Sequence, residues 1–259
     1  MLLPLKQGTL YGPVDSRRYG RSLGINLSPF TDKLCSFNCV YCHYGQTARL
    51  TMNSEKYRDD LPAFEDVIDE LEESLESPVE LDLITFSGNG EPTLHPWFPE
   101  LVDAVIDLRD RCRPNAKVAL LSNTTGLDNP KVRKSVTKLD LPVFKLDAGT
   151  EETFKKINRP ARQVKFNEIV EHLGQIDGIY LQTVLVDGTP SNTEPDELLA
   201  YFELLGKIEP REVHLYSTDR PVPSSQIYRV DPEWLEDIAS QIRSETGVPA
   251  VAFYNGKQD

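Results

Sequence analysis

The sequence has no long hydrophobic run and comparatively little positive charge. No apolar segment of the 259 residues approaches the roughly 18 needed to cross a bilayer, and the first ten residues lack the pattern of an export signal. Lys and Arg number 28 against 41 Asp and Glu, so the formal net charge is -13. A surface this acidic repels nucleic-acid phosphates overall, although a local basic patch can override the mean. These features predict a cytoplasmic protein with no membrane contact, and they disfavour tRNA as a partner.

Cysteine is also scarce, and its distribution is uneven. Cys35, Cys39 and Cys42 fall within eight residues, whereas Cys112 is distant and lies on an apolar helical face, where we expect an inert core thiol. In a reducing compartment such clustering favours metal binding or catalysis over disulfides. An iron–sulfur cubane has four irons, so three thiolates leave one iron without a protein ligand. An open metal position of this kind is what a catalytic site needs.

The alternative is a structural zinc site completed by His43 or by a distant group. Zinc sites usually use paired Cys or His residues, and the sequence contains no second pair. Because His43 directly follows Cys42, it is an awkward ligand for the same ion. The spacing therefore favours an iron–sulfur cluster.

Short apolar runs alternate with amphipathic stretches along the whole chain. The predicted strands are 22–27, 80–87, 117–122, 142–147, 179–186, 211–217 and 249–253, and the predicted helices are 60–76, 97–112, 130–138, 165–175, 195–206 and 232–245. Strands alternating with helices indicate an α/β fold with a parallel sheet and right-handed crossovers. We expect one domain over 1–259, with its core at about 20–220, built as an open partial (βα)6 barrel. A doubly wound sheet is the second choice. In either fold, functional residues collect at the C-terminal ends of the strands.

The cysteine segment, with Tyr41 between its second and third cysteines, resembles the signature of the radical S-adenosylmethionine superfamily. The resemblance implies that Cys35, Cys39 and Cys42 hold a [4Fe-4S] cluster, that S-adenosylmethionine chelates the fourth iron, and that Tyr41 lies beside the adenine. It also implies reductive cleavage of that cofactor to a 5′-deoxyadenosyl radical, which abstracts hydrogen from a substrate. An electron donor similar to flavodoxin or ferredoxin is then expected.

A polar segment follows the second predicted strand and consists of Gly88, Asn89, Gly90 and Glu91. Glycines at a strand end let the backbone approach a ligand closely, and a carboxylate can pair with an ammonium group. The segment is similar to the superfamily's GGE motif, which holds the methionine amino group of the cofactor, with Asn89 inserted between the glycines. The resemblance therefore makes all four residues candidates for cofactor binding.

The third predicted strand ends at Ser122 and Asn123. The superfamily uses this strand end to hydrogen-bond the ribose or carboxylate of the cofactor, so the resemblance makes both residues candidates. Serine and asparagine also favour turns and helix caps, so an ordinary turn or cap explains these two residues equally well.

Lys145 and Asp147 share one face of the predicted strand 142–147. Charges within a buried parallel strand are costly unless they are paired or functional, so both are candidates for catalysis. The alternative is a mutual salt bridge that fills the barrel. Gln182 and Tyr216, on the next two strands, are predicted to line the same cavity. Gln182 is a candidate for cofactor binding, and Tyr216 is a candidate for catalysis. His214 is equally well explained as a satisfied interior histidine.

The stretches 12–27, 85–96 and 143–160 resemble radical enzymes grouped with the wyosine-type tRNA-modifying synthases. Those synthases carry additional N-terminal cysteines for a second cluster, and no cysteine precedes Cys35 here. A second branch, the glycyl-radical activases, which modify a protein, is similar in length and has a segment similar to Gly90-Glu91-Pro92. A scaffold that binds zinc or an iron–sulfur cluster without catalysis is the alternative from another class. The substrate is not predicted.

A basic cluster follows the fourth predicted strand. Its members are Lys155, Lys156, Arg159, Arg162 and Lys165. Such a cluster can attract a phosphate or carboxylate substrate, although a solvated helical face is the commoner explanation.

Overall fold

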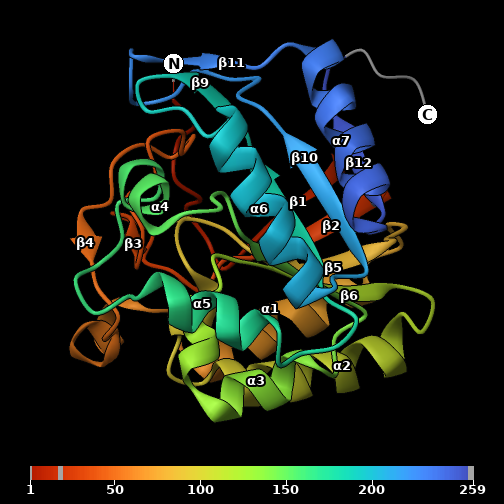
Figure 1. The fold of residues 1–259 in the computed structure, drawn as a ribbon. Helices are drawn as coiled ribbons and strands as arrows, with labels where there is room; N and C mark the ends of the chain where they lie inside the picture. Colours follow the sequence, from red (N-terminus) through yellow and green to blue (C-terminus); the bar gives the residue numbers. More distant parts are fainter. Residues whose placement is uncertain (1, 17–19, 256–259) are drawn as a thin grey trace. The chain divides into compact units, whose positions relative to one another are not determined.

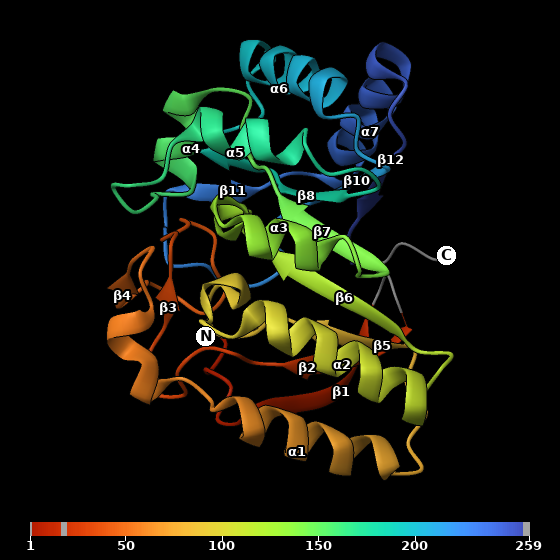
Figure 2. The same ribbon diagram turned by 90° about the horizontal axis from the view of Figure 1, so that it is seen from below.

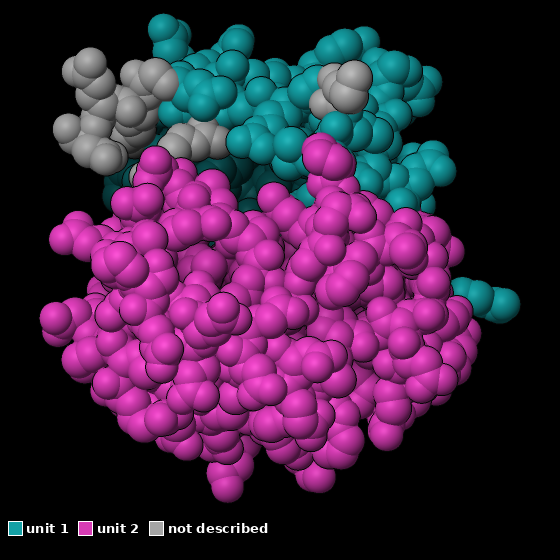
Figure 3. Space-filling view, turned by 180° about the vertical axis from the view of Figure 1, so that it is seen from behind, with its two compact units in different colours: residues 1–3, 37–46, 144–259 teal, residues 4–36, 47–143 magenta. Residues whose placement is uncertain are grey.

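The computed structural model describes residues 2–16 and 20–255 and divides into two compact units. Unit 1 comprises residues 1–3, 37–46 and 144–259, and unit 2 comprises residues 4–36 and 47–143 (Figure 3). Residues 17–19, within the first of the stretches compared above, lie outside the described residues. The unit boundaries separate Cys35, in unit 2, from Cys39 and Cys42, in unit 1.

Unit 2 contains the first strands of the sheet. In the order in which they are hydrogen-bonded, these are β1 (Leu10–Ser16), β2 (Gly20–Ile25), β5 (Leu83–Phe86) and β6 (Lys117–Ser122). β1 is antiparallel to β2, whereas β2, β5 and β6 are parallel. The short strands β3 (Leu34–Cys35) and β4 (Arg49–Leu50) form a separate parallel pair. All four residues of β5 are buried, as expected for a central parallel strand.

The described residues of unit 2 include three α-helices: α1 (Phe64–Glu76), α2 (Phe98–Cys112) and α3 (Pro130–Val136) (Figures 1 and 2). α1 buries Val67, Leu71 and Leu75, whose spacing of four places them on one face. α2 and α3 have proline at the first turn, where the missing N–H costs no helical hydrogen bond. The same described residues also form the 3-10 turns η1 (Glu55–Asp60), η2 (Pro92–Leu94) and η3 (Thr125–Asp128).

The boundary between the units falls within β7 (Leu141–Lys145). Unit 1 then contains the parallel strands β8 (Tyr180–Val184), β10 (Glu212–Tyr216) and β12 (Ala250–Phe253), in that order. Its helices are α4 (Glu151–Ile157), α5 (Phe166–Leu173), α6 (Pro195–Ile208) and α7 (Pro232–Thr246). Figure 2 shows α6 and α7 on the same side of β8 and β10. A small antiparallel pair joins β9 (Val186–Gly188) to β11 (Ile227–Arg229).

The predicted α/β class with parallel strands is confirmed, and β1 and α4 are among the elements that were not predicted. β1 contains Gly12 and Pro13, which are rare in strands, and its pairing with β2 is irregular between Tyr11 and Val14. α4 is seven residues long, too short to show helical periodicity in the sequence. Within residues 2–16 and 20–255, no helix combines the length and apolar character needed to cross a membrane.

Candidate active site

Cys35 is the last residue of β3 in unit 2, and its thiol is buried. Its carbonyl accepts a hydrogen bond from the N–H of Thr51, at 3.0 Å, which continues the pairing with β4. The Asn123 side-chain Nδ2 lies 3.4 Å from Cys35 Sγ and 2.8 Å from Ser36 Oγ. Asn123 follows the C-terminal end of β6, so the end of this parallel strand lies beside the first cysteine.

Cys39 and Cys42 belong to one turn of unit 1. The N–H of Cys42 donates to the carbonyl of Cys39 at 3.2 Å, and the N–H of Val40 donates to the carbonyl of Ile157 at 2.9 Å. Cys39 is 9% exposed, and Cys42 is half-buried. Burial, and then the charge of Asp147, raise the pKa of the Cys39 thiol to about 11. Near neutral pH this thiol is therefore protonated in the metal-free protein, and a bound cation would favour the thiolate.

Tyr41, between these two cysteines, belongs to a buried polar network. Its phenol donates to Asp147 Oδ2, which also accepts a hydrogen bond from Asn158 Nδ2 at 2.6 Å. The other carboxylate oxygen of Asp147 accepts from the N–H of Val184 at 2.8 Å. Asp147 is 2% exposed and lies two residues beyond the end of β7, rather than within the strand as predicted. Its carboxylate thus links the cysteine turn to the C-terminal ends of β7 and β8.

Lys145 is the last residue of β7. Its ammonium lies 3.9 Å from Asp147 Oδ1 and 5.2 Å from the centre of the Tyr41 ring, in cation–π geometry. The closer partners of Asp147 are the phenol and amide groups of the network, so the ion pair with Lys145 is a secondary contact. The structure therefore brings Lys145, Asp147 and Tyr41 together within unit 1, as the sequence analysis expects of the first two.

Gln182 and Tyr216 lie on neighbouring strands of unit 1. Gln182 is on β8, and its carbonyl accepts from the N–H of Leu146 at 3.3 Å. Tyr216 ends β10, and its ring stacks on Phe253 with centroids 5.3 Å apart. His214 Nε2 lies 2.6 Å from a carboxylate oxygen of Glu212, which is a structural pairing of the kind anticipated for an interior histidine.

In unit 2, Glu91 joins the ends of β5 and β6. Its Oε1 accepts from the Thr93 N–H at 3.1 Å, from the Thr93 hydroxyl at 2.5 Å and from the Ser122 hydroxyl at 2.8 Å. Its Oε2 accepts from the N–H of Asn123 at 2.6 Å. Burial raises the pKa of Glu91, while these hydrogen bonds act in the opposite direction. The carboxylate predicted to face an ammonium group is thus already held by four protein donors.

Asn89, inserted in the glycine motif, is fully buried. Its Nδ2 donates to the carbonyls of Lys6 and Pro29, at 2.9 and 3.0 Å, and its Oδ1 accepts from the N–H of Lys6 at 2.7 Å. These contacts tie the motif to the N-terminal segment and to the residues after β2. The side chain of Asn89 therefore holds the loop in place through hydrogen bonds within the protein.

The two glycines of the motif are required by close packing. Gly88 has φ of +141°, and a side chain there would overlap the Asn26 side chain. A Cβ on Gly90 would overlap the carbonyl oxygen of Leu34, the residue before Cys35. The motif thus packs directly against the segment that carries the first cysteine.

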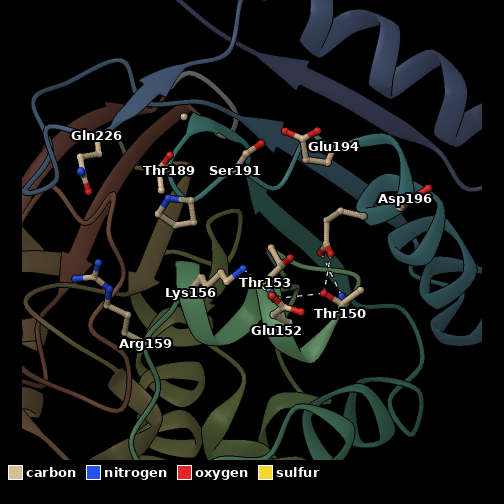
Figure 4. A pocket seen from close by; sticks show the side chains of 13 residues that line it. Thr150, Glu152, Thr153, Lys156, Arg159, Thr189, Ser191, Glu194, Asp196 and Gln226 are labelled. Carbon is tan, nitrogen blue, oxygen red and sulfur yellow. Dashed lines mark hydrogen bonds and ion pairs between the residues drawn. The ribbon is translucent and has the colours of Figure 1, made fainter.

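A cavity of about 810 Å³ lies in unit 1 (Figure 4). It is lined by residues of 150–159, of 188–197 and by Gln226. Glu197 is held at its wall by the N–H of Gly149, at 2.5 Å, and by the hydroxyl of Thr150, at 2.7 Å. The side chains of Lys156 and Arg159 also line the cavity, so part of the predicted basic cluster faces it.

Most of that basic cluster is neutralised locally. Its lysines form ion pairs three or four residues along their own helices: Lys155 with Glu151 at 2.9 Å, Lys156 with Glu152 at 2.7 Å, and Lys165 with Glu168 at 2.6 Å. Arg159 forms no ion pair with any residue of the described chain. A solvated helical face therefore explains the lysines. Arg159 lines the cavity without such an ion pair among the described residues.

The family model described as the Radical SAM superfamily matches residues 33–193. The chain belongs to the radical S-adenosylmethionine superfamily. A curated relative from Synechocystis, named UPF0026 protein, is 31% identical, covering 93% of this chain and 94% of the relative. Another relative, named GTPase Obg, from Brachyspira hyodysenteriae, is 29% identical over 96% of this chain, which spans only 36% of that protein.

Solved structures of other superfamily members share the fold. A radical SAM methyltransferase from Sphaerobacter thermophilus superposes with a TM-score of 0.63 at 15% identity, covering 91% of this chain and 67% of that chain. TYW1 with a lysine-pyruvate adduct bound superposes with a TM-score of 0.61 at 15% identity, and the match covers 87% of this chain and 74% of that chain. The predicted partial barrel is therefore confirmed, and the protein is an enzyme of this superfamily.

Radical SAM enzymes use a [4Fe-4S] cluster and S-adenosylmethionine, so both predicted cofactors are confirmed. The residues of this chain fit a cluster. Cys35, Cys39 and Cys42 form no disulfide, and a side-chain amide lies near the sulfur of the first two. Within each unit, the described residues include no group of three or more His, Cys, Asp or Glu side chains that would hold a single metal ion.

Two buried asparagines of unit 1 were missed by the sequence analysis. Asn158 contacts Cys39, Tyr41 and Asp147 through Nδ2. Asn192 Nδ2 donates to the carbonyl of Asp147 at 2.7 Å and to that of Val184 at 2.9 Å. Neither lies in a recognisable local pattern, and each has a partner far away in the sequence: Cys39 and Tyr41 for Asn158, and Asp147 for Asn192. The one sequence signal is that Asn158 lies within the stretch 143–160, which resembles other radical enzymes.

Proposed function

We propose that this radical SAM enzyme reductively cleaves S-adenosylmethionine and abstracts hydrogen from its substrate. When bound, the [4Fe-4S] cluster supplies the electron for that cleavage, and the cofactor supplies the 5′-deoxyadenosyl radical. The observation that carries the proposal is the family match over 33–193, which spans the three cysteines and every other proposed site residue except Tyr216. Three thiolates leave one iron of a cubane without a protein ligand.

Cys35, Cys39 and Cys42 are proposed as the cluster ligands. All three are free cysteines, and burial raises the pKa of the Cys39 thiol, which a bound metal would lower. Cys112 is half-buried at the end of α2, away from this motif in the sequence, and is proposed to have no role in the chemistry.

The cofactor-binding residues are proposed to act in two groups. Tyr41 and Gln182 belong to unit 1, whereas Gly88, Asn89, Gly90, Glu91, Ser122 and Asn123 belong to unit 2. The side chains of Asn89, Glu91 and Asn123 already hold hydrogen bonds within the protein. We therefore infer that this segment offers S-adenosylmethionine mainly backbone groups, and that these three side chains hold the loop in shape.

We propose that Lys145, Asp147 and Tyr216 serve catalysis, Lys145 and Tyr216 by meeting the substrate and Asp147 by acting through its neighbours. The Lys145 side chain is 19% exposed, whereas the Asp147 carboxylate is fully buried and satisfied by Tyr41 and Asn158. We infer that Lys145 contacts the substrate and that Asp147 orients Lys145 and Tyr41. The cavity in unit 1, which Arg159 helps to line, is proposed to admit part of a substrate.

The whole chain is proposed to act as one radical SAM domain that receives its electron from a flavodoxin- or ferredoxin-like protein. The net charge of -13 favours a small molecule or a protein over tRNA as the substrate. Modification of a protein, as by glycyl-radical activases, is the second candidate, because an acidic surface permits a protein partner.

Anaerobic reconstitution with iron and sulfide tests the proposal. We expect a brown, oxygen-sensitive protein with about four irons per chain and reductant-dependent release of 5′-deoxyadenosine. Cys39→Ala should lose both properties and keep its fold, as judged by circular dichroism. Cys112→Ala is the matched control and should keep both. A wild-type chain that binds zinc, or holds a cluster but leaves the cofactor uncleaved, would be a binding scaffold instead.

A further inference from the structure

The Asn158 side chain reaches the sulfur of a proposed cluster ligand. It is 1% exposed and follows α4 directly. Its Nδ2 lies 2.6 Å from Asp147 Oδ2, 3.3 Å from the Tyr41 hydroxyl and 3.5 Å from Cys39 Sγ. Because the carboxylate can only accept a hydrogen bond, Nδ2 and not Oδ1 must face this group of atoms. The orientation of the amide is therefore fixed.

The backbone around Asn158 holds the side chain in that position. Its carbonyl accepts from the N–H of Asn38 at 3.0 Å, and the carbonyl of Ile157 accepts from the N–H of Val40. Phe37 and Pro160 form an antiparallel bridge further along. Residues 157–160 thus run beside residues 37–40, so the amide and Cys39 are fixed to each other by main-chain hydrogen bonds.

Asn123 repeats this arrangement in unit 2. Its Oδ1 accepts from the N–H of Thr125 at 3.1 Å and from the Thr125 hydroxyl at 2.8 Å. Its Nδ2 therefore faces the other way, toward Ser36 Oγ at 2.8 Å and Cys35 Sγ at 3.4 Å. The backbone N–H of Asn123 donates to Glu91. The side-chain amide of Asn123 is therefore held by its contacts with Thr125 and by the backbone that carries it.

Amide donors at cysteine sulfurs have a known electrostatic consequence. Reduction adds negative charge to an iron–sulfur cluster, and an N–H dipole aimed at a sulfur ligand stabilises that charge. Each such hydrogen bond therefore raises the reduction potential and makes the cluster easier to reduce. An asparagine supplies this donor without a charge of its own, so the effect does not depend on pH.

We propose that Asn123 and Asn158 are positioning residues that each donate an N–H···S hydrogen bond to a cluster ligand, Cys35 and Cys39, and thereby raise the reduction potential of the cluster. This inference rests on the proposed function, because it requires the cluster on these cysteines. It assigns Asn123 to the sulfur of Cys35, not to the ribose or carboxylate of the cofactor.

The midpoint potential of the reconstituted full chain, measured by an EPR-monitored redox titration without S-adenosylmethionine, tests the proposal. Asn158→Leu and Asn123→Leu should each lower the ratio of reduced to oxidised cluster at a fixed potential about tenfold, which corresponds to about 59 mV for one electron. The shifts should add in the double variant, because the two amides contact different cysteines. Asn192→Leu is the matched control, since Asn192 is a buried amide bonded to Asp147 and to the carbonyl of Val184. Its potential should stay at the wild-type value.

An unchanged potential in Asn158→Leu or Asn123→Leu with four irons retained, or an equal shift in Asn192→Leu, would overturn the proposal. Pulsed EPR on the reduced wild-type chain, with 15N in the side-chain amides of asparagine, decides the matter if a variant fails to fold. The proposal requires a 15N coupling to the cluster, and its absence contradicts it. A wild-type chain that holds no four-iron cluster refutes the proposed function itself, whereas a normal cluster with unshifted variants refutes this inference alone.

Discussion

The phenol of Tyr41 donates a hydrogen bond to the carboxylate of Asp147, 106 residues further along the chain. Both side chains are buried, and Asn158 donates to the same carboxylate oxygen. Burial, and then the charge of Asp147, raise the pKa of Tyr41 well above its usual value, so the phenol stays protonated and remains a donor. The aromatic residue of the cysteine motif thus fixes the acid at the end of β7.

Tyr41→Phe removes this donor and keeps the ring. A hydrogen bond to a charged group contributes about 1.5–3 kcal/mol, so we expect a loss of that size in the free energy of unfolding. Tyr201→Phe is the matched control, because its hydroxyl lies 2.5 Å from that of Thr183, a neutral partner, and should cost about 0.5–1.5 kcal/mol. Urea denaturation of the metal-free proteins measures both. Equal losses in the two variants would show that Asp147 carries no charge that needs Tyr41.

Gly90→Ala should distort the segment that precedes the first cysteine. The added methyl group would overlap the carbonyl oxygen of Leu34, and backbone cannot move aside as a flexible side chain can. We expect a loss of about 1–3 kcal/mol or more, with lower iron content after reconstitution. Gly206→Ala, in α6, is the control, since no atom lies within 4 Å of its added Cβ. That change should stabilise the protein by about 0.5–1 kcal/mol, as alanine favours a helix. Normal iron content in Gly90→Ala would show that this contact does not shape the cysteine segment.

The metal-free protein should lose stability in alkali because of Cys39. Burial raises the pKa of this thiol from 9.0 to about 11. Since the folded pKa lies above the unfolded one, the stabilising contribution is complete below pH 9 and is lost as the pH rises through 11. Between pH 8 and pH 11 the wild type should lose about 2 kcal/mol more than Cys39→Ala, measured by urea denaturation. Parallel pH profiles for the two proteins would mean that Cys39 is not buried as described.

The fold was predictable wherever one short pattern decides an element. β6 spans the predicted residues 117–122, because an apolar run there is bounded by polar residues and turns. Pro195 and Pro232 begin α6 and α7 at the predicted positions, since proline suits the first turn of a helix. β1 was missed because its glycine and proline argue against a strand, although an irregular edge strand tolerates both.

The candidate site was predictable only in its local part. Cys35, Cys39 and Cys42 lie within eight residues, and their spacing alone indicates a metal-binding site. Asn158 meets Cys39 across 119 positions in the sequence, and only the fold brings them together. The motif of Gly88 to Glu91 was found, but its packing role was not, because the overlap with Leu34 and the four donors to Glu91 depend on tertiary structure. The ligand roles of these residues stay predictions.

An EPR spectrum of the dithionite-reduced, reconstituted protein, recorded with and without S-adenosylmethionine, tests the open coordination site most directly. If three cysteines leave one iron accessible, the cofactor binds that iron, and the g values of the reduced cluster change when it is added. The same change should occur in Cys112→Ala. A reduced four-iron signal that is identical with and without saturating S-adenosylmethionine would contradict the account.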